Sequence, residues 1–302
     1  MDEHTVIKTF RIKEELSTMS KSLSKVLVLL LAVMLMGLAA CGVSNSNATT
    51  EESAAKTENV PAADEIAEAP AGGLSAAQVG DVITFGTYEQ DGDMENGAEP
   101  IEWLVLDRDD DRILVLSRYG LDCQTYHPRL ENVTWQSCAL RTWLNDKFLS
   151  TAFSSSEQAM IPTVTITAED EVLYKDGAGY IIDPGEDTQD KVFALSIAEA
   201  QIYLGNSWFE KGSDNNDYPN AYCKATPYAI SQGLWVIDYD GDAAEWAKEA
   251  WDGNCFWWLR GPAICNLGVA NVDYYGAIYT SYYNGGLTTG AVRPALWICL
   301  TA

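Results

Sequence analysis

Apolar and polar residues alternate at the start of the folded part of the chain. The stretch "VGDVITFGTYEQD" (79–91) shows this alternation and predicts a strand that ends in a glycine-containing turn. The segments 101–107 and 112–118 are rich in Leu, Ile and Val, and they flank the acidic turn 108–111. We therefore expect a β-hairpin near the start of the domain.

The spacing of apolar residues becomes helical further along the chain. The segments "SSSE" (154–157) and "SIAE" (196–199) match the capping-box pattern, so we expect a helix to begin at each, the second running to Leu204. Between them, "PTVTIT" (162–167) is typical of a strand. Before them, one helical face is predicted from four large apolar residues: Leu140, Trp143, Leu144 and Phe148.

The last third alternates short apolar runs with Gly and Asn. Three strands are expected there, in "LGVANV" (267–272), "GAIYTS" (276–281) and "AVRPALWICL" (291–300). The sequence therefore predicts an α+β fold with short antiparallel strands and hairpins and with two to three helices.

The first forty residues have the pattern of a secretion signal. Lys21 and Lys25 precede an apolar run, 26–38, and small residues lead to Cys41. The run is shorter than the ~20 residues that a membrane-spanning helix needs. The ending "LAAC" resembles a bacterial lipobox, so we expect lipidation of Cys41. The expected location is the bacterial cell membrane, lipid-anchored on its extracytoplasmic face.

Three parts follow from this interpretation. Residues 1–40 are the expected signal peptide, with Met19 as an alternative true start. Residues 41–75 are rich in Ala, Glu, Asn, Thr and Pro and have no hydrophobic period, so they predict a lipidated, disordered acidic tether. Residues 76–302 are long enough for one large domain.

The charge of the chain limits its partners. There are 44 Asp and Glu against 19 Lys and Arg, a formal net charge of −25. Nucleic acids and anionic lipids both need basic patches on the protein, so nucleic acid is excluded as a partner. The lipid anchor is the expected contact with the membrane.

Besides Cys41 the chain has six cysteines, and an even number outside the cytosol permits disulfides. None of them forms a CxxC pair, and only His127 lies beyond the leader, so we expect no zinc site. The spacing does not determine the pairing, and several thiols can be buried core residues. The six are Cys123, Cys138, Cys223, Cys255, Cys265 and Cys299.

No catalytic residue is assigned from the sequence. Serine or cysteine catalysis with a histidine base would rest on His127 alone, and a lone His before Pro is more often structural. Phosphate-binding and dinucleotide-binding glycine motifs are absent from the sequence. We therefore expect a protein that is not an enzyme.

One segment invites a calcium interpretation, and no other cofactor is expected. Four acidic residues fall at positions 1, 3, 5 and 12 of a calcium loop: Asp238, Asp240, Asp242 and Glu249. The sixth position, where such loops need Gly, is Ala243. The alternative is an acidic turn that leads into a solvated helix.

The C-terminal stretches "CFWWLRGP" (255–262), "ANVDYYGAIY" (270–279) and "GAVRPALWI" (290–298) resemble the ending of a family of uncharacterised bacterial surface proteins. Earlier stretches match it as well: "GDVITFGTYEQD", "EWLVLD", "RTWLNDKFLSTAFSSSE" and "ATPYA". The resemblance covers most of 79–300. It implies a C-type lectin-like fold, which is shared by formylglycine-generating enzymes and by target proteins of diversity-generating retroelements.

The chain departs from that pattern in several places. Gly261 stands where Ser is expected, and residues 236–254 look like an insertion. "YPN" (218–220) is only a faint echo of the tripeptides with which animal lectins bind calcium and sugar. Formylglycine-generating enzymes need a redox-active cysteine pair, and the resemblance points to Cys255 and Cys265.

Between Gly261 and Gly290 the only charged residue is Asp273, whereas charged residues make up 21% of the whole chain. Tyr, Gly, Ser, Thr and Asn replace them, the mixture that antibody-like binding surfaces use. We therefore predict an exposed recognition face between scaffold strands, in which Arg260 and Arg293 hold a loop or pair with a buried carboxylate. Its candidate ligand-binding residues are Ile264, Asn266, Leu267, Asp273, Tyr274, Tyr275, Tyr279, Ser281, Tyr282, Tyr283 and Asn284.

The same region contains no Lys, Glu, Gln, Met or Trp from Ala263 to Val292. Retroelement mutagenesis randomises adenines, and changing the first two bases of an Asn codon cannot produce those residues. Diversification by a retroelement is therefore one hypothesis, and a Tyr- and Gly-rich composition is the other.

The expected function is a lipid-anchored cell-surface protein that binds an extracellular protein or glycan through its C-terminal loops. The alternative is an enzyme, either formylglycine-generating-like or carbohydrate-active. An enzyme would bring Cys255 and Cys265 together in a pocket, or would place two carboxylates about 5–10 Å apart.

Overall fold

The computed structural model describes residues 73–129, 131–168, 184–207, 217–238, 248, 251–262, 268–280 and 289–300. All of them belong to one compact unit, Asp64–Ala302. The expected signal peptide and nearly all of the expected tether lie outside the described residues. The end of the expected tether is ordered, because Arg108 Nη2 donates to the Ser75 carbonyl oxygen at 3.0 Å.

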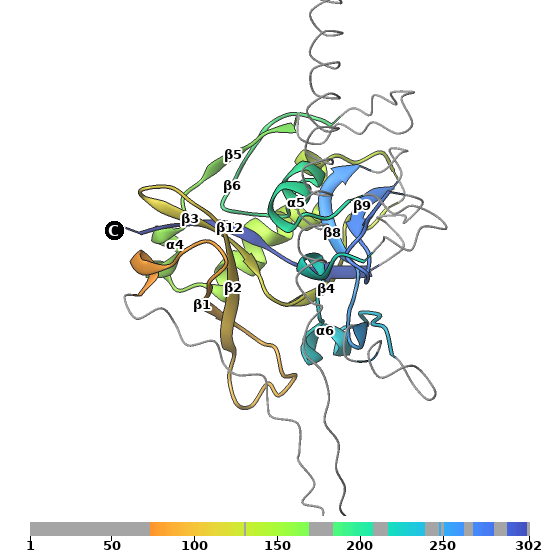
Figure 1. Cartoon of the computed structure of the whole chain (residues 1–302), viewed down its shortest axis with the longest axis horizontal. Coiled ribbons are helices and arrows are strands. Elements are labelled where there is room, and N and C mark those ends of the chain that lie inside the picture. The colour runs from red at the N-terminus through yellow and green to blue at the C-terminus, as the bar shows by residue number, and fades with distance from the viewer. Residues whose placement is uncertain are drawn as a thin grey trace, which may run out of the picture. The chain divides into compact units, whose positions relative to one another are not determined.

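The first sheet brings the two ends of the domain together. The expected hairpin is confirmed: β2 and β3 pair antiparallel with Val105 opposite Val115, and Asp109 lies in the turn between them. The last strand, β12, pairs with β3 on the other side (Figure 1). The order is β1 (Val82–Tyr88), β2 (Glu99–Arg108), β3 (Arg112–Ser117), β12 (Ala295–Cys299) and β7 (Val192–Phe193), antiparallel throughout.

The second sheet carries the tyrosine-rich segment. Its strands pair antiparallel except β8 and β11, which are parallel. The strand expected at 291–300 is wrong in one respect, because Arg293 and Pro294 separate two strands that belong to different sheets. Proline has no N–H to continue a ladder. The order is β10 (Ile278–Tyr279), β9 (Val269–Val272), β8 (Trp257–Pro262), β11 (Thr289–Val292) and β4 (Asp122–Thr125).

A third, two-stranded sheet confirms the strand expected in "PTVTIT". It pairs β5 (Val164–Ile166) with β6 (Thr188–Asp190).

The helices begin where the capping patterns predict. Ser154 caps α4 (Ser155–Met160) with Glu157, and Ser196 caps α5 (Ile197–Leu204) with Glu199. Before them, η2 (Trp135–Ser137) leads into one helical stretch made of α2 (Ala139–Trp143), the π-helical η3 (Leu144–Phe148) and α3 (Leu149–Ala152). The expected apolar face of that stretch is confirmed, since Leu140, Leu144 and Phe148 are buried and the half-buried Trp143 packs against the same core.

One helix was not expected. The short α6 (Pro227–Ser231) begins with Pro at its first position and with Thr226 as its cap, whose hydroxyl accepts from Ala229 N at 3.1 Å. Single turns of 3₁₀-helix complete the described elements: η1 (Leu74–Ala76) and η5 (Pro219–Ala221). In the described part of the chain, no helix is long and apolar enough to span a membrane.

Buried tryptophans form hydrogen bonds between strands within each of the two large sheets. Trp103 donates from Nε1 to the Phe85 carbonyl oxygen at 2.7 Å within the first sheet. In the second sheet, Trp258 Nε1 donates to the Gln124 carbonyl oxygen at 2.9 Å. These bonds satisfy the indole N–H groups of rings that are almost fully buried, so the tryptophans of "CFWWLRGP" are core residues.

Arg260 has the carboxylate partner that the sequence leads us to expect. This buried side chain extends from β8 and donates from Nη1 to Glu199 Oε2 on α5 at 2.5 Å. It also donates to the Ala194 carbonyl oxygen at 3.1 Å. The ion pair therefore fixes α5 against the second sheet.

Candidate aromatic recognition site

The centre of the tyrosine-rich segment is a tight turn between β9 and β10, residues 273–277, which we call the aromatic turn. Asp273 Oδ1 accepts hydrogen bonds from the backbone N–H groups of Tyr275 and Ala277, both at 2.9 Å. The Asp273 N–H donates to the Ala277 carbonyl oxygen at 2.8 Å. One carboxylate thus organises the whole turn, which explains why the only charged residue of this segment lies here.

Three distant segments hold the aromatic turn from outside. The Tyr218 N–H donates to the Tyr275 carbonyl oxygen at 2.9 Å. Asn206 Nδ2 donates to the Gly276 carbonyl oxygen at 3.0 Å, and Asn254 Nδ2 donates to that of Tyr274 at 3.1 Å. The turn backbone is therefore positioned by tertiary contacts.

Gly276 is required by both conformation and space. Its φ is +81°, a region that L side chains rarely adopt. A Cβ there would lie 2.3 Å from the Tyr218 carbonyl oxygen. The close approach of residue 218 therefore depends on a glycine at this position.

The turn presents its tyrosines within a row of four aromatic rings, which we call the aromatic row. Trp235 contacts Tyr274 with ring centroids 5.7 Å apart, and Tyr274 contacts Tyr275 at 4.5 Å. Trp251 contacts Tyr275 at 4.9 Å. All three pairs are T-shaped, and Trp235 is 58% exposed whereas the two tyrosines are half-buried. The aromatic row therefore has two half-buried tyrosines in its middle and an exposed tryptophan, Trp235, at one end.

Two polar side chains, Tyr222 and Asp217, lie next to Trp251 at the other end of the aromatic row. Trp251 Nε1 lies 2.8 Å from Tyr222 Oη, and the Tyr222 hydroxyl donates to Asp217. Burial and the neighbouring carboxylate raise the pKa of Tyr222 to about 12, so its hydroxyl stays protonated at neutral pH. Hydrogen-bonding groups therefore lie next to the rings, as recognition of a polar ligand requires.

The surroundings of Asp273 change the pKa of its carboxyl group. Desolvation raises the pKa of this carboxyl to about 6, although the N–H groups of Ala277 and Tyr275 act in the opposite direction. The group that organises the turn therefore titrates close to neutral pH.

Some of the candidate residues come together here, and others lie outside the described residues. Asp273, Tyr274 and Tyr275 share the aromatic turn. Tyr279 is half-buried on β10, opposite Asn271. The remaining candidates lie outside the described residues: Ile264, Asn266, Leu267, Ser281, Tyr282, Tyr283 and Asn284.

The sequence reasoning missed Trp235, Trp251 and Tyr222. Trp235 and Trp251 come from a Trp-rich stretch whose mixed pattern predicts no element, and Tyr222 precedes that stretch. All three lie 20 or more positions before the turn in the chain. The signal that the sequence did offer is compositional, because Trp and Tyr are enriched at interfaces.

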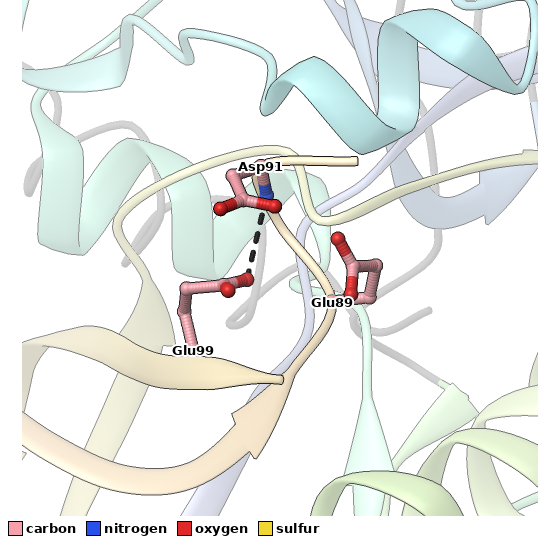
Figure 2. A group of neighbouring side chains, drawn as sticks. All are labelled: Glu89, Asp91 and Glu99. Carbon is pink, nitrogen blue, oxygen red and sulfur yellow. Dashed lines mark hydrogen bonds between the residues drawn. The ribbon is translucent and has the colours of Figure 1, made fainter. Parts of the chain in front are cut away.

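The calcium pattern of the sequence falls mostly outside the described residues. Asp238 is exposed, and Asp240, Asp242 and Glu249 are not described. The described residues instead bring together Glu89, Asp91 and Glu99, whose ligand oxygens lie within 4.8 Å of one another (Figure 2).

These three carboxylates belong to residues 89–99, which we call the acidic loop, between β1 and β2. Oxygen ligands of this kind suit calcium or magnesium. Their oxygens already accept backbone N–H groups: Gln90 donates to Glu99 at 2.7 Å, and Gly92 donates to Glu89 at 2.7 Å. The hydrogen bonds account for the arrangement without an ion.

The cysteine contacts bear on the enzyme alternative. Cys255 lies against Cys223, a contact that the sequence did not indicate, and Cys265 lies outside the described residues. Cys138 is structural, because its sulfur caps α2 by accepting from Arg141 N at 3.3 Å. Burial raises the pKa of Cys138 to about 12, which keeps it an unreactive thiol.

A cleft of about 390 Å³ lies between α5, β5 and the first sheet. Its charged groups already have partners, since Glu199 pairs with Arg260, and Arg112 pairs with Asp109 at 2.8 Å. Its lining includes Arg112, Thr165, Phe193, Glu199, Tyr203 and Trp297. Nothing in this lining forms a nucleophile–base pair.

Comparison of the chain with known proteins identifies its family, and the family has no known function. No curated protein and no solved structure matches the chain. One family model matches residues 110–300, which include the aromatic turn, the aromatic row and both buried arginines but not the acidic loop. The chain therefore belongs to the family described as "Domain of unknown function (DUF6273)".

Proposed function

We propose that the chain is a lipid-anchored cell-surface protein that binds an extracellular protein or glycan through the aromatic row and the loops around it. The observation that carries this proposal is the aromatic turn, whose carbonyl oxygens are held by Tyr218, Asn206 and Asn254. A turn fixed in this way presents Tyr274 and Tyr275 with little entropy left to lose on binding.

The finer fold is part of the same proposal. We infer a C-type lectin-like domain from the sequence resemblance, and the mixture of antiparallel sheets with few helices agrees with it. The lipid anchor at Cys41 and the extracytoplasmic location rest on the leader pattern. Together they would display the domain at the bacterial surface.

The proposal includes diversification of the binding loops by a retroelement. Its support is the absence of Lys, Glu, Gln, Met and Trp from 263–292. A reverse-transcriptase gene near the coding sequence, together with an adenine-rich near-copy of the region, would support it. A genome with neither would remove this element and leave the binding proposal intact.

Binding is tested with the full chain against an array of glycans and a panel of purified surface proteins. The double substitution Tyr274→Ala and Tyr275→Ala should weaken any specific binding by roughly 30-fold, which corresponds to about 2 kcal/mol for a central aromatic contact. Trp235→Ala should weaken it as well, because this ring is the accessible end of the row.

The matched control is Ile202→Ala on α5, a side chain that is 74% exposed and outside the aromatic row. It should leave binding unchanged. Binding that survives the tyrosine substitutions would place the site elsewhere, and the absence of specific binding on both panels would overturn the proposal.

A further inference from the structure

Arg293 is a buried cation without a carboxylate partner among the described residues. Only 4% of the residue is exposed, and its Nε donates to the Ser117 carbonyl oxygen at 2.9 Å. Its guanidinium carbon lies 4.9 Å from the centre of the Trp257 ring. Neither a carbonyl nor a ring neutralises a full charge, and an uncompensated buried charge is strongly unfavourable. Of the two roles expected for this arginine, the structure therefore supports the holding of backbone segments, at Ser117 and Ala221, and shows no carboxylate pairing among the described residues.

Two buried thiols, Cys223 and Cys255, lie in the same part of the core: Arg293 Nη1 donates to the Ala221 carbonyl oxygen at 3.4 Å, two residues before Cys223. Cys223 and Cys255 are directly opposite each other, because Lys224 and Asn254 form an antiparallel bridge and Cys255 N donates to the Cys223 carbonyl oxygen at 2.8 Å. Both sulfurs approach one point above Gly120, at 3.4 and 3.3 Å from where its Cβ would lie. The S–H of Cys255 donates to the Cys223 carbonyl oxygen at 3.2 Å.

This geometry suits a disulfide. Directly opposite residues of antiparallel strands have Cα atoms about 4.5–5.5 Å apart, within the range that disulfides span. Both sulfurs approach the same point above Gly120, so a bond between them needs little movement of the backbone.

The electrostatics favour one thiolate over the other. Burial alone would raise the pKa of Cys223, but the Cys255 thiol and the Arg293 guanidinium outweigh burial and lower it. Burial and the neighbouring Cys223 raise the pKa of Cys255 well above its ordinary value. The guanidinium thus acquires an anionic partner when Cys223 loses its proton.

We propose that Cys223 and Cys255 are a dithiol–disulfide pair and that Arg293 stabilises its reduced form by pairing with the Cys223 thiolate. The proposal does not rest on the proposed function. It assigns a chemical role to three buried groups that ligand binding does not use.

The oxidation requires a disulfide oxidant, such as oxidised glutathione or a protein disulfide. The Cys223 thiolate attacks one sulfur of the oxidant, forms a mixed disulfide and releases one thiolate. Cys255 then gives its proton to water and attacks the Cys223 sulfur, which forms the S–S bond and releases the second thiolate. The pair loses two electrons, and the oxidant gains them as two thiols.

The pair lies next to residues that build the aromatic row. Cys223 follows Tyr222, and Cys255 follows Asn254, which holds the Tyr274 carbonyl oxygen. Both thiols are buried, so exchange proceeds through local opening or during folding. A closed disulfide would tie together the two segments that support the aromatic row.

The test is an equilibrium of the full chain with mixtures of reduced and oxidised glutathione, followed by acid quenching, alkylation and peptide mass spectrometry. We expect one pair of linked peptides that joins Cys223 to Cys255, while Cys138 remains alkylated. A link from either thiol to Cys123 or Cys265 would overturn the proposal. So would full alkylation of both thiols after refolding in oxidised glutathione.

The role of Arg293 has its own readout. Arg293→Met should shift the equilibrium toward the disulfide by about tenfold or more, the factor that corresponds to one pKa unit. Arg293→Lys keeps the charge and should shift it less. An unchanged equilibrium in the Met variant would overturn the role of the charge.

If the Arg293 variants do not fold, two cysteine variants test the ion pair instead. In a pH titration of the reduced protein, the ultraviolet absorbance of a thiolate should appear at lower pH than that of an ordinary thiol, and Cys223→Ser should abolish this early signal because it removes the anion. Cys255→Ser should retain it. The reverse pattern, or a thiolate signal in the unsubstituted protein that appears only in the pH range of an ordinary thiol, would contradict the ion pair.

Discussion

The aromatic turn and the acidic loop are both short connections between antiparallel strands, and both contain carboxylates that accept backbone N–H groups. They differ in what holds them. The acidic loop has one contact from outside, at its first turn, where Tyr228 N donates to the Gln90 carbonyl oxygen at 2.9 Å. The rest of the loop is held by its own side chains: Asp93 N donates to Asp91 at 2.7 Å, and Asn96 Nδ2 donates to Asp91 at 2.7 Å. The aromatic turn is held in addition by Tyr218, Asn206 and Asn254, which are distant in sequence.

This difference bears on which region can recognise a ligand. Local hydrogen bonds in solvent are exchanged for water at little cost, so the acidic loop keeps its conformational freedom. Tertiary contacts from three segments fix the aromatic turn before a ligand arrives, and preorganisation improves affinity. A dense group of acidic residues is therefore a weaker sign of a site here than one half-buried aspartate.

The largest expected effect separates two glycines with similar backbone angles. Gly276→Ala places a Cβ 2.3 Å from a backbone oxygen, whereas Gly92 has φ +83° and no atom within 4 Å of its would-be Cβ. Gly92→Ala should therefore cost only about 1–2 kcal/mol, the penalty of a left-handed backbone. Gly276→Ala should cost at least about 2 kcal/mol more because of the clash. Urea unfolding of the full chain measures both.

Equal losses of stability in the two variants would mean that residue 218 moves away freely. The aromatic turn would then be as loosely held as the acidic loop, and the distinction between the two regions would fail.

The next effect is a dependence of stability on pH that comes from Asp273. Its pKa is about 6 in the folded chain and 3.8 in the reference state, so the folded chain holds more protons between these values. The free energy of unfolding should therefore fall as pH rises from about 4 to about 6, by roughly 3 kcal/mol in total. Asp273→Asn should remove this component, because it keeps an acceptor oxygen without a titrating group.

Asp91→Asn in the acidic loop is the matched control. Hydrogen bonds from Asp93 and Asn96 lower the pKa of Asp91, so its contribution to stability has the opposite sign. This substitution should keep the fall between pH 4 and 6. If the fall persists in Asp273→Asn instead, the buried carboxyl is not its cause.

Much of the fold could be predicted from local patterns. The capping boxes at Ser154 and Ser196 locate two helix starts because both partners of each box lie within four residues. The β2–β3 hairpin is equally local. Pro294 marks a break that the sequence could have indicated, because proline cannot continue a ladder. That the strands on its two sides belong to different sheets could not be predicted, because only the tertiary structure separates them.

The candidate site also has residues that the sequence indicates and residues that only the fold brings to it. Asp273, Tyr274 and Tyr275 were found by composition, since the segment lacks other charges. Trp235 and Trp251 join them only through folding. The two buried arginines show the limit most clearly: Arg260 has the carboxylate that its setting suggests, whereas Arg293 lies beside thiols 38 and 70 positions earlier in the chain.

Backbone hydrogen exchange of the full chain tests most directly whether the aromatic turn is fixed before a ligand binds. The amides of Tyr275 and Ala277, which donate to Asp273, should exchange as slowly as strand amides such as that of Val105. The amides of Gly92 and Asp93, bonded only within the acidic loop, should exchange much faster. Exchange of Tyr275 and Ala277 as fast as that of Gly92 and Asp93 would contradict the account.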